Sequence, residues 1–273
     1  MNLKPILQKK LFGHGKIFSE IIDLINEGVM PNKILLSGPK GSGKSTIAYH
    51  LINYIFSKDE EFKYNYGNHE INHDNRSFKL LLNGSHPNFY LIDLLDDKKN
   101  IEINQIRKMI EYTNKSTFNN LSKYIMIDNV ENLNINSANA LLKIVEEYNE
   151  KIYFILIHNN KKKIISTLKS RCLNYKINLS FHDSIKITNN LINNNIYEVL
   201  NDDLINHYNT PGDYINLVNF ALENKINLKD FLLKDFLIFI INNNYYKKNN
   251  FIKSHISNFI ESYFLSISNQ SIH

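Results

Sequence analysis

The stretch Gly38-Pro39-Lys40-Gly41-Ser42-Gly43-Lys44-Ser45, followed by Thr46, decides the fold of this sequence. Its glycines let the backbone curl until several N–H groups point at one anion, which is how a loop cradles a phosphate. The stretch fits the pattern G-x-x-x-x-G-K-[ST], in which the lysine reaches the β- and γ-phosphates of a nucleotide and the next hydroxyl ligates Mg²⁺. The residues expected to bind nucleotide are Gly38, Gly41, Ser42, Gly43, Lys44, Ser45 and Thr46, with Ser45 also a magnesium ligand.

The residues on either side support this interpretation. Residues 33–37 read as a short buried strand entering the loop, and residues 47–56 read as the helix leaving it. A helix that begins at such a loop turns the positive end of its dipole towards the phosphates. The alternative is a glycine-rich turn that binds nothing, because loops of this kind can persist in subunits that no longer use them.

Composition favours a protein with a substantial core. The chain has 273 residues and a mass of 32.0 kDa, of which 43% are hydrophobic and 22% charged residues. Its one cysteine, Cys172, excludes a disulfide framework or a cysteine-built zinc site within the chain. A net charge of +5 permits a nucleic-acid partner without arguing for one. We find no apolar segment of signal-peptide or spanning type, so we expect a cytoplasmic protein without a membrane partner.

Apolar strands and amphipathic helices alternate as far as about residue 179. The expected strands after the loop are 88–93, 123–128, 152–157 and 172–177, and the expected helices are 16–26, 103–112, 137–147 and 163–170. This order predicts an α/β fold, a parallel sheet with helices on both faces. The polar, unpatterned residues 57–77 are expected to form an exposed insertion. His69 and His73 lie four residues apart there, but without a further ligand we expect structural or solvated histidines rather than a metal site.

After Leu179 the sequence is helical, with breaks at Pro211-Gly212, near Asn227 and at residues 242–244. We therefore expect a nucleotide-binding α/β domain over 1–179, a helical lid over 180–226 and a short helical segment over 227–273. The last segment holds two helices, 229–241 and 250–266, and two helices bury too little surface to be stable alone. It is expected to pack on the lid or on other subunits.

Asp128 is the second part of the expected nucleotide site. It follows a buried strand, at the sheet edge where ligands gather, and an acid there holds the Mg²⁺ shell. An ATP-hydrolysing protein usually has Glu directly after this Asp to orient the attacking water, whereas here the next residue is Asn129. Glu131 lies two positions further on and is expected to point elsewhere. Since a positioned acid–base group is worth about 10²–10⁴ in rate, we expect binding with little hydrolysis.

Taken together, these motifs resemble the bacterial sliding-clamp loader subunits of the AAA+ superfamily, and within that group most closely the delta-prime subunits of DNA polymerase III. The resemblance extends over about residues 3–225. It rests on the phosphate loop, on Asp128 with the helix that follows it, and on the triplet Ser170-Arg171-Cys172. Further matches are Phe12-Gly13-His14, residues 84–88 and residues 101–107.

The resemblance implies a ring-like assembly that places a sliding clamp on primed DNA. The arginine matching Arg171 reaches into the ATP site of a neighbouring subunit in such rings, and a planar guanidinium suits that role. The alternative is a surface arginine paired with a carboxylate. His158 or Asn159 lies where the family has its first sensor residue, and either could contact a γ-phosphate or cap the strand.

Three departures from the family pattern are visible. The cysteine-built zinc module of the ATP-hydrolysing subunits is missing, so no zinc is expected. Asp213 follows Pro211-Gly212 where the second sensor arginine is expected, and the C-terminal oligomerisation segment is short. The apolar residues after Asn250, with Phe259 and Phe264 among them, are expected to contact other loader subunits.

The leading hypothesis is a clamp-loader subunit that binds Mg-ATP, hydrolyses it little and donates Arg171 to a neighbour. Its implied partners are the delta and ATPase subunits and, through the assembly, the clamp and DNA. The main alternative is an autonomous AAA+ ATPase acting on nucleic acid or protein. A small-molecule kinase ranks last, because it would need several phosphate-binding arginines and the chain has three, Arg76, Arg107 and Arg171.

Overall fold

We analysed a computed structural model of the chain. It describes residues 2–95, 98–115, 121–146, 151–206 and 209–270. The chain divides into two compact units, Asn2–Asn178 and Leu179–His273, a division that coincides with the end of the alternating pattern in the sequence. Each unit is described by itself.

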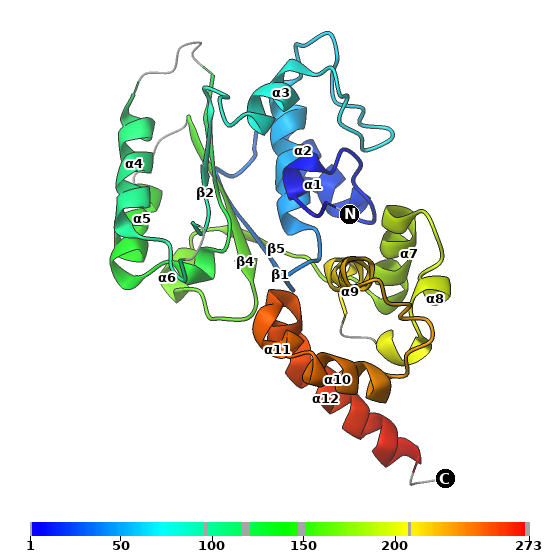
Figure 1. Ribbon diagram of the computed structural model, residues 1–273. Helices are drawn as coiled ribbons and strands as arrows, with labels where there is room; N and C mark the ends of the chain where they lie inside the picture. The colour runs from blue at the N-terminus through cyan, green and yellow to red at the C-terminus, as the bar shows by residue number, and fades with distance from the viewer. Residues whose placement is uncertain (1, 96–97, 116–120, 147–150, 207–208, 271–273) are drawn as a thin grey trace. The chain divides into compact units, whose positions relative to one another are not determined.

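The first unit is built on a parallel five-stranded sheet (Figure 1). The strands lie in the order β2-β3-β4-β1-β5, and all four neighbouring pairs are parallel. Their bounds are β1 Lys33–Gly38, β2 Phe89–Ile92, β3 Lys123–Ile127, β4 Ile152–Asn159 and β5 Leu173–Lys176. The helices are α1 Gly15–Asn26, α2 Lys44–Phe56, α3 Arg76–Leu82, α4 Ile103–Asn114, α5 Ile135–Glu146 and α6 Ser166–Lys169, with short 3-10 turns η1 Pro5–Leu7 and η2 Val130–Asn132.

Both faces of the sheet are covered, which explains why its central strands are continuous apolar runs. Ile34 and Leu36 of β1 pack with α1 and α2 on one face, whereas Leu35 points to the face that α4 and α5 cover. Figure 1 shows these two helical layers on opposite sides of the sheet. The predicted fold class is confirmed, and because the strands are parallel their carboxyl ends meet at one edge, where the phosphate loop begins.

The expected exposed insertion over residues 57–77 is exposed at many positions, but a few of its side chains are buried in the core. Tyr64 and Ile71 are buried in the core beside α1 and α2, and Asn75 is fully buried. Asn75 Oδ1 accepts hydrogen bonds from the Phe78 N–H at 2.6 Å and from Asn53 Nδ2 at 3.0 Å. Because its hydrogen bonds are made within the protein, the polar side chain of Asn75 can be buried without an unpaired acceptor.

The second unit is entirely helical within the described residues. Its helices are α7 Phe181–Ile192, α8 Ile196–Val199, α9 Pro211–Asn224, α10 Leu233–Asn242, α11 Tyr245–Lys248 and α12 Asn250–Gln270, with a 3-10 turn η3 Asp202–Leu204. Residues 180–226 and 227–273 share one hydrophobic core here, in which Tyr214 and Phe220 of α9 meet Phe236 of α10 and Phe259 of α12. The short C-terminal helices are therefore stabilised by packing on the preceding ones.

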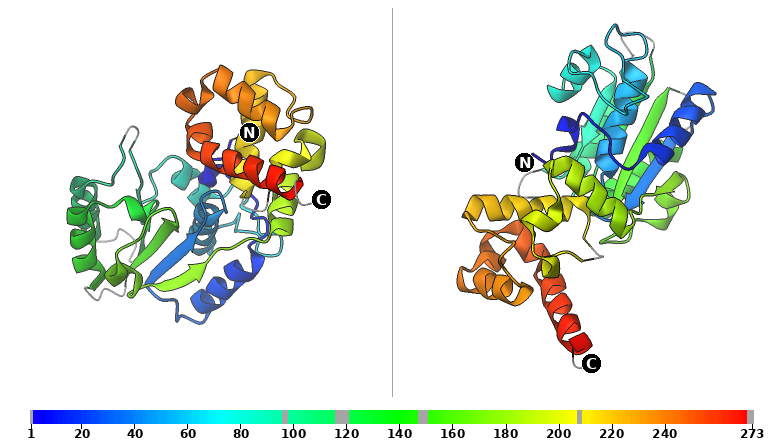
Figure 2. Two further views of the ribbon diagram at one scale, coloured as in Figure 1. Left: turned by 90° about the horizontal axis from the view of Figure 1, so that it is seen from below. Right: turned by 90° about the vertical axis from the view of Figure 1, so that its right-hand side faces the viewer.

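The two halves of α12 differ in exposure. Ile252 and Phe259 are buried, whereas Phe264 is 64% exposed and Leu265 55% exposed. Figure 2 shows the end of this helix, in red, extending past the other helices of its unit. The expectation that Phe259 contacts other subunits was wrong, because its ring packs edge-on against Phe236 with 5.4 Å between the centroids. That expectation stays a prediction for Phe264.

Asp213, which replaces the arginine expected in the lid, is used inside its own unit. It caps α9 through Thr210, and its Oδ1 lies 3.1 Å from Nε2 of His255 on α12. Hydrogen bonds from His255 and Thr210 outweigh burial and lower the pKa of this carboxyl group. The residue therefore links α9 to α12.

Among the helices that the structure describes, none is long and apolar enough to span a membrane.

Candidate functional site

The phosphate loop lies between the end of β1 and the start of α2, as predicted. Gly38 is required by close packing, because a Cβ atom there would lie 2.2 Å from the Ile177 carbonyl oxygen. Gly43 has a φ of 89°, a left-handed conformation that favours glycine, and forms the N-cap of α2. The first N–H groups of α2 have no partners within the helix. The loop therefore has the tight glycine turn and the helix start that the sequence predicted.

His14 supports this loop from the start of α1, a role that the sequence did not reveal. Its Nε2 donates a hydrogen bond to the Ser42 carbonyl oxygen at 2.7 Å, and the imidazole is buried. A Cβ atom at Gly43 would lie 2.9 Å from the same nitrogen. Gly13-His14 before the first helix was the available signal, but the 28 residues that separate His14 from Ser42 hid the contact.

Lys44 has a buried ammonium group at the base of the loop. Its Nζ donates to the Pro39 carbonyl oxygen, and the side chain is 3% exposed. Burial lowers the pKa of Lys44 to about 8, although the negative charges of Asp128 and Glu131 act to raise it. Burial disfavours the charged form of this ammonium, and the negative charge of a phosphate group would stabilise it.

Ser45 and Asp128 meet as the sequence predicted. The Ser45 hydroxyl donates to Asp128 Oδ2 at 2.6 Å, across the gap between α2 and the end of β3. Burial raises the pKa of Asp128 to about 6, while the hydrogen bond from Ser45 opposes that rise and the nearby Asp93 adds to it. A hydroxyl beside a destabilised carboxylate is a suitable oxygen pair for Mg²⁺.

This raised pKa predicts that Asp128→Asn stabilises the protein without nucleotide. The folded state holds the Asp128 proton more tightly than the unfolded chain, so ionisation opposes folding above pH 6 and the effect fades as the pH falls towards 4. At pH 7.5 the variant should gain about 1–3 kcal/mol in the free energy of unfolding. Urea unfolding at pH 7.5 and pH 4.5 would measure this, and a variant that is less stable at pH 7.5 would contradict it.

The two candidate sensor residues at the end of β4 differ in their contacts. His158 Nε2 pairs with the Lys162 carbonyl oxygen at 2.8 Å, so its ring serves the local turn. The Asn159 side chain faces the strand ends instead, and Asn159 Nδ2 donates to Asn129 Oδ1 at 2.9 Å. Its backbone N–H donates to Glu131 Oε2 at 3.1 Å. Of the two, Asn159 is the one connected to the residues around Asp128.

The expectation that Glu131 points elsewhere was wrong. Its carboxylate accepts the hydrogen bond from Asn159, and its charge favours the protonated form of Lys44. The 3-10 turn η2 directs the side chain back towards the sheet edge, a turn that the sequence pattern did not indicate.

Arg171 lies just after α6 and is held by its own unit. Its Nη2 lies 2.7 Å from Glu146 Oε1 at the end of α5, and its Nη1 donates to the Thr167 carbonyl oxygen at 2.8 Å. Both partners of the ion pair are substantially exposed, 37% for Arg171 and 51% for Glu146. The paired arginine that the sequence left open as an alternative is thus present in this structure.

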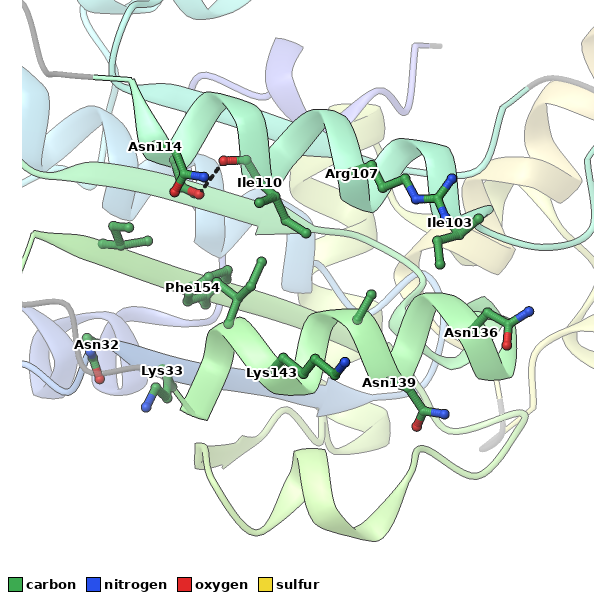
Figure 3. Close-up of a pocket in the computed structure, with 14 residues that line it drawn as sticks. Asn32, Lys33, Ile103, Arg107, Ile110, Asn114, Asn136, Asn139, Lys143 and Phe154 are labelled. Carbon is green, nitrogen blue, oxygen red and sulfur yellow. Dashed lines mark hydrogen bonds between the residues drawn. The ribbon is translucent and has the colours of Figure 1, made fainter.

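A groove of about 710 Å³ lies between α4 and α5, and none of the residues lining it belongs to the phosphate loop (Figure 3). Apolar side chains such as Ile110 and Phe154 line it together with Arg107, Lys143 and Lys33. Its charge suits an anionic partner, and it is separate from the phosphate loop.

The described parts of the chain hold no group of three or more His, Cys, Asp or Glu side chains placed to bind a metal. His69 packs edge-on against Phe18 at 5.5 Å between ring centroids, and His73 pairs with Asp74 at 3.0 Å. His69 thus packs against an aromatic ring, and the exposed side chain of His73 pairs with a neighbouring carboxylate.

The family model described as "DNA polymerase III, delta subunit" matches residues 13–180, more than half of the chain. The chain belongs to this family.

Individual members of clamp-loader families agree with this assignment. The DNA polymerase III subunit delta' of Pseudomonas aeruginosa is 27% identical over 139 residues, covering 51% of this chain and 40% of the relative. The gamma subunit of Buchnera aphidicola subsp. Schizaphis graminum is 31% identical over 242 residues, covering 83% and 62%. The resemblance to delta-prime subunits is confirmed, and the chain spans about half the length of the curated relatives it matches.

Among solved structures, the RuvB Holliday junction branch migration motor of Thermotoga maritima matches with a TM-score of 0.48 and 16% identity. The match covers 86% of this chain and 73% of that structure.

Proposed function

We propose that this member of the delta-subunit family acts as a delta-prime-like subunit of the DNA polymerase III clamp loader. The observation that carries the proposal is the family match over residues 13–180, which is most of the α/β unit, together with relatives that are themselves named delta' and gamma subunits. Its partners are other clamp-loader subunits and, through the assembly, the sliding clamp and primed DNA. The basic residues Arg107 and Lys143 along the groove between α4 and α5 support contact with nucleic-acid phosphates.

Within this role the chain binds a nucleoside triphosphate at the loop. Lys44 serves the β- and γ-phosphates, and Ser45 and Asp128 hold the Mg²⁺ that neutralises phosphate charge when it is bound. The loop's shape, with the cramped Gly38 and the left-handed Gly43, supports this fit. Asn129 offers an amide where a carboxylate is needed, and hydrolysis by this chain is therefore slow.

Arg171 serves the nucleotide site of a neighbouring subunit. Breaking the ion pair between Arg171 and Glu146 costs little free energy, because an exposed ion pair of this kind is worth about 0–1 kcal/mol. A γ-phosphate offers the guanidinium a more highly charged partner of matching shape. An autonomous AAA+ ATPase is the alternative function, and the observation that favours it is the carboxylate of Glu131, held at the strand ends by the Asn159 N–H.

Nucleotide binding is tested by thermal denaturation of Lys44→Ala. At about 100 times its dissociation constant, Mg-ATP should stabilise the wild-type chain by about 2.7 kcal/mol. Lys44→Ala should lose that stabilisation, because its buried ammonium is the phosphate's main cationic partner. Lys40→Ala is the matched control, since Lys40 lies in the same loop but is exposed, and it should keep most of the shift. Equal shifts for wild type and Lys44→Ala, or none for either, would refute nucleotide binding at this loop.

A further inference from the structure

A chain of polar side chains joins three strand ends beside the nucleotide site. Asp93 follows β2, Asn129 follows β3 and Asn159 ends β4. Asn129 Nδ2 donates to Asp93 Oδ1 at 2.7 Å, and Asn129 Oδ1 accepts from Asn159 Nδ2 at 2.9 Å. Since Asp93 can only accept when ionised, these contacts fix which way the Asn129 amide points.

Both the nitrogen and the oxygen of the Asn129 side-chain amide are thus engaged in hydrogen bonds. Its backbone is left-handed, with a φ of 56°, a conformation that asparagine tolerates better than most residues. An amide cannot take a proton from water, and this one is occupied by its neighbours. The residue that follows Asp128 therefore serves the structure of the strand ends and not the chemistry of hydrolysis.

Glu131 brings a carboxylate to the same edge of the sheet. Asn159, whose N–H holds Glu131 Oε2 at 3.1 Å, is paired in register with Gly38, the first residue of the phosphate loop. The next residue is also tied to the loop, because the Asn160 N–H donates to the Gly38 carbonyl oxygen at 3.3 Å. Glu131 is half-buried and carried on a 3-10 turn that Val130 anchors in the core.

The pairing of β4 with β1 brings the Asn159 N–H that holds Glu131 beside Gly38, where the phosphate loop begins. Asp128 is engaged by the Ser45 hydroxyl at 2.6 Å and belongs to the magnesium pair. Glu131 is therefore a further carboxylate at this edge of the sheet that is not part of that pair.

We propose that Glu131 orients the water that attacks the γ-phosphate in this chain, replacing the glutamate that is missing after Asp128. This inference rests on the proposed nucleotide binding. In the step, the water oxygen forms a bond to the γ-phosphorus while the bond to the β,γ-bridging oxygen breaks, giving nucleoside diphosphate and phosphate. Glu131 accepts the proton that the water loses and passes it to the released phosphate. Asn159 holds Glu131, and the pair Asp93–Asn129 holds Asn159.

The test uses the full chain with Mg-ATP and the variant Glu131→Gln. The amide oxygen of glutamine keeps an acceptor for the Asn159 N–H, so the fold is preserved, but the group can no longer accept a proton. In single-turnover assays with protein in excess, wild type should hydrolyse ATP slowly but measurably faster than Lys44→Ala. Glu131→Gln should be slower than wild type by about tenfold or more. Glu61→Gln, an exposed site, should not change the rate.

A second readout separates this role from a structural one. By titration calorimetry, Glu131→Gln should bind ADP like wild type and bind ATP at least as tightly, because a negative charge facing the γ-phosphate has been removed. The inference is overturned if wild type is no faster than Lys44→Ala, if Glu131→Gln matches wild type, or if the variant loses ADP affinity. If wild type binds ATP and its turnover does not depend on Glu131, only this inference is contradicted. If wild type does not bind ATP, the proposed nucleotide site is contradicted as well.

Discussion

Arg171→Ala should lower the rate of ATP hydrolysis by about 10³–10⁵-fold at the one site of the assembled loader that this arginine serves. The DNA-stimulated rate of the whole assembly should then fall by at least the share of that site. The guanidinium's planar fork spreads positive charge over the γ-phosphate oxygens, and no other group in that site replaces it in our account. Arg171→Lys should rescue poorly, since an ammonium keeps the charge but not the fork.

The change should leave the chain itself intact. Arg171 is partly exposed and its ion pair with Glu146 is a surface one, so the free energy of unfolding should change by less than about 1 kcal/mol. Glu146→Gln is the matched control, because it removes the same ion pair but leaves the arginine. That control should keep the full hydrolysis rate. An assembled loader with Arg171→Ala and normal ATPase and clamp loading would show that Arg171 is only structural.

Phe259→Ser should destabilise the helical unit by about 3–5 kcal/mol, because it removes a buried ring and leaves a cavity and a hydroxyl in the core. Phe264→Ser, five residues further along α12, should change the free energy of unfolding by less than about 0.5 kcal/mol, since Phe264 is 64% exposed. Urea unfolding followed by far-UV circular dichroism distinguishes the two. Equal midpoints for both variants would contradict the packing of α12 described above.

The strands and the main helices could be predicted because each has a strong local pattern. The buried strands 152–157 and 123–128 are continuous apolar runs, and they became β4 and β3 with bounds shifted by two residues or fewer. The helix expected over 163–170 is shorter in the structure, Ser166–Lys169, because Ile165 has an extended backbone and acts as its N-cap. Local pattern identifies the elements well and their ends less well.

The candidate site was predictable only where the chemistry is local. The loop 38–45 and the pairing of Ser45 with Asp128 follow from motif and strand position. His14 and Glu131 do not, because their contacts join residues 28 positions apart in both cases. Such contacts depend on tertiary structure, which a single sequence does not reveal.

Phe259 illustrates the same limit from the opposite direction. Apolar residues recur at the same helical spacing along the whole of α12, so the sequence does not show which of them face the core of their own unit. Packing against Phe236 decides it for Phe259, whereas Phe264 is exposed. The sequence correctly predicted an amphipathic helix, but it could not distinguish the apolar residues that are buried in the core from those that stay exposed.

The central claim, membership of a clamp-loader assembly, is tested most directly by size-exclusion chromatography with the cognate delta and ATPase subunits of DNA polymerase III. We expect the chain to elute with them in one complex, and we expect that complex to load the sliding clamp onto primed DNA only when the chain is included. A chain that elutes alone, beside a set of subunits that loads the clamp without it, would contradict the account.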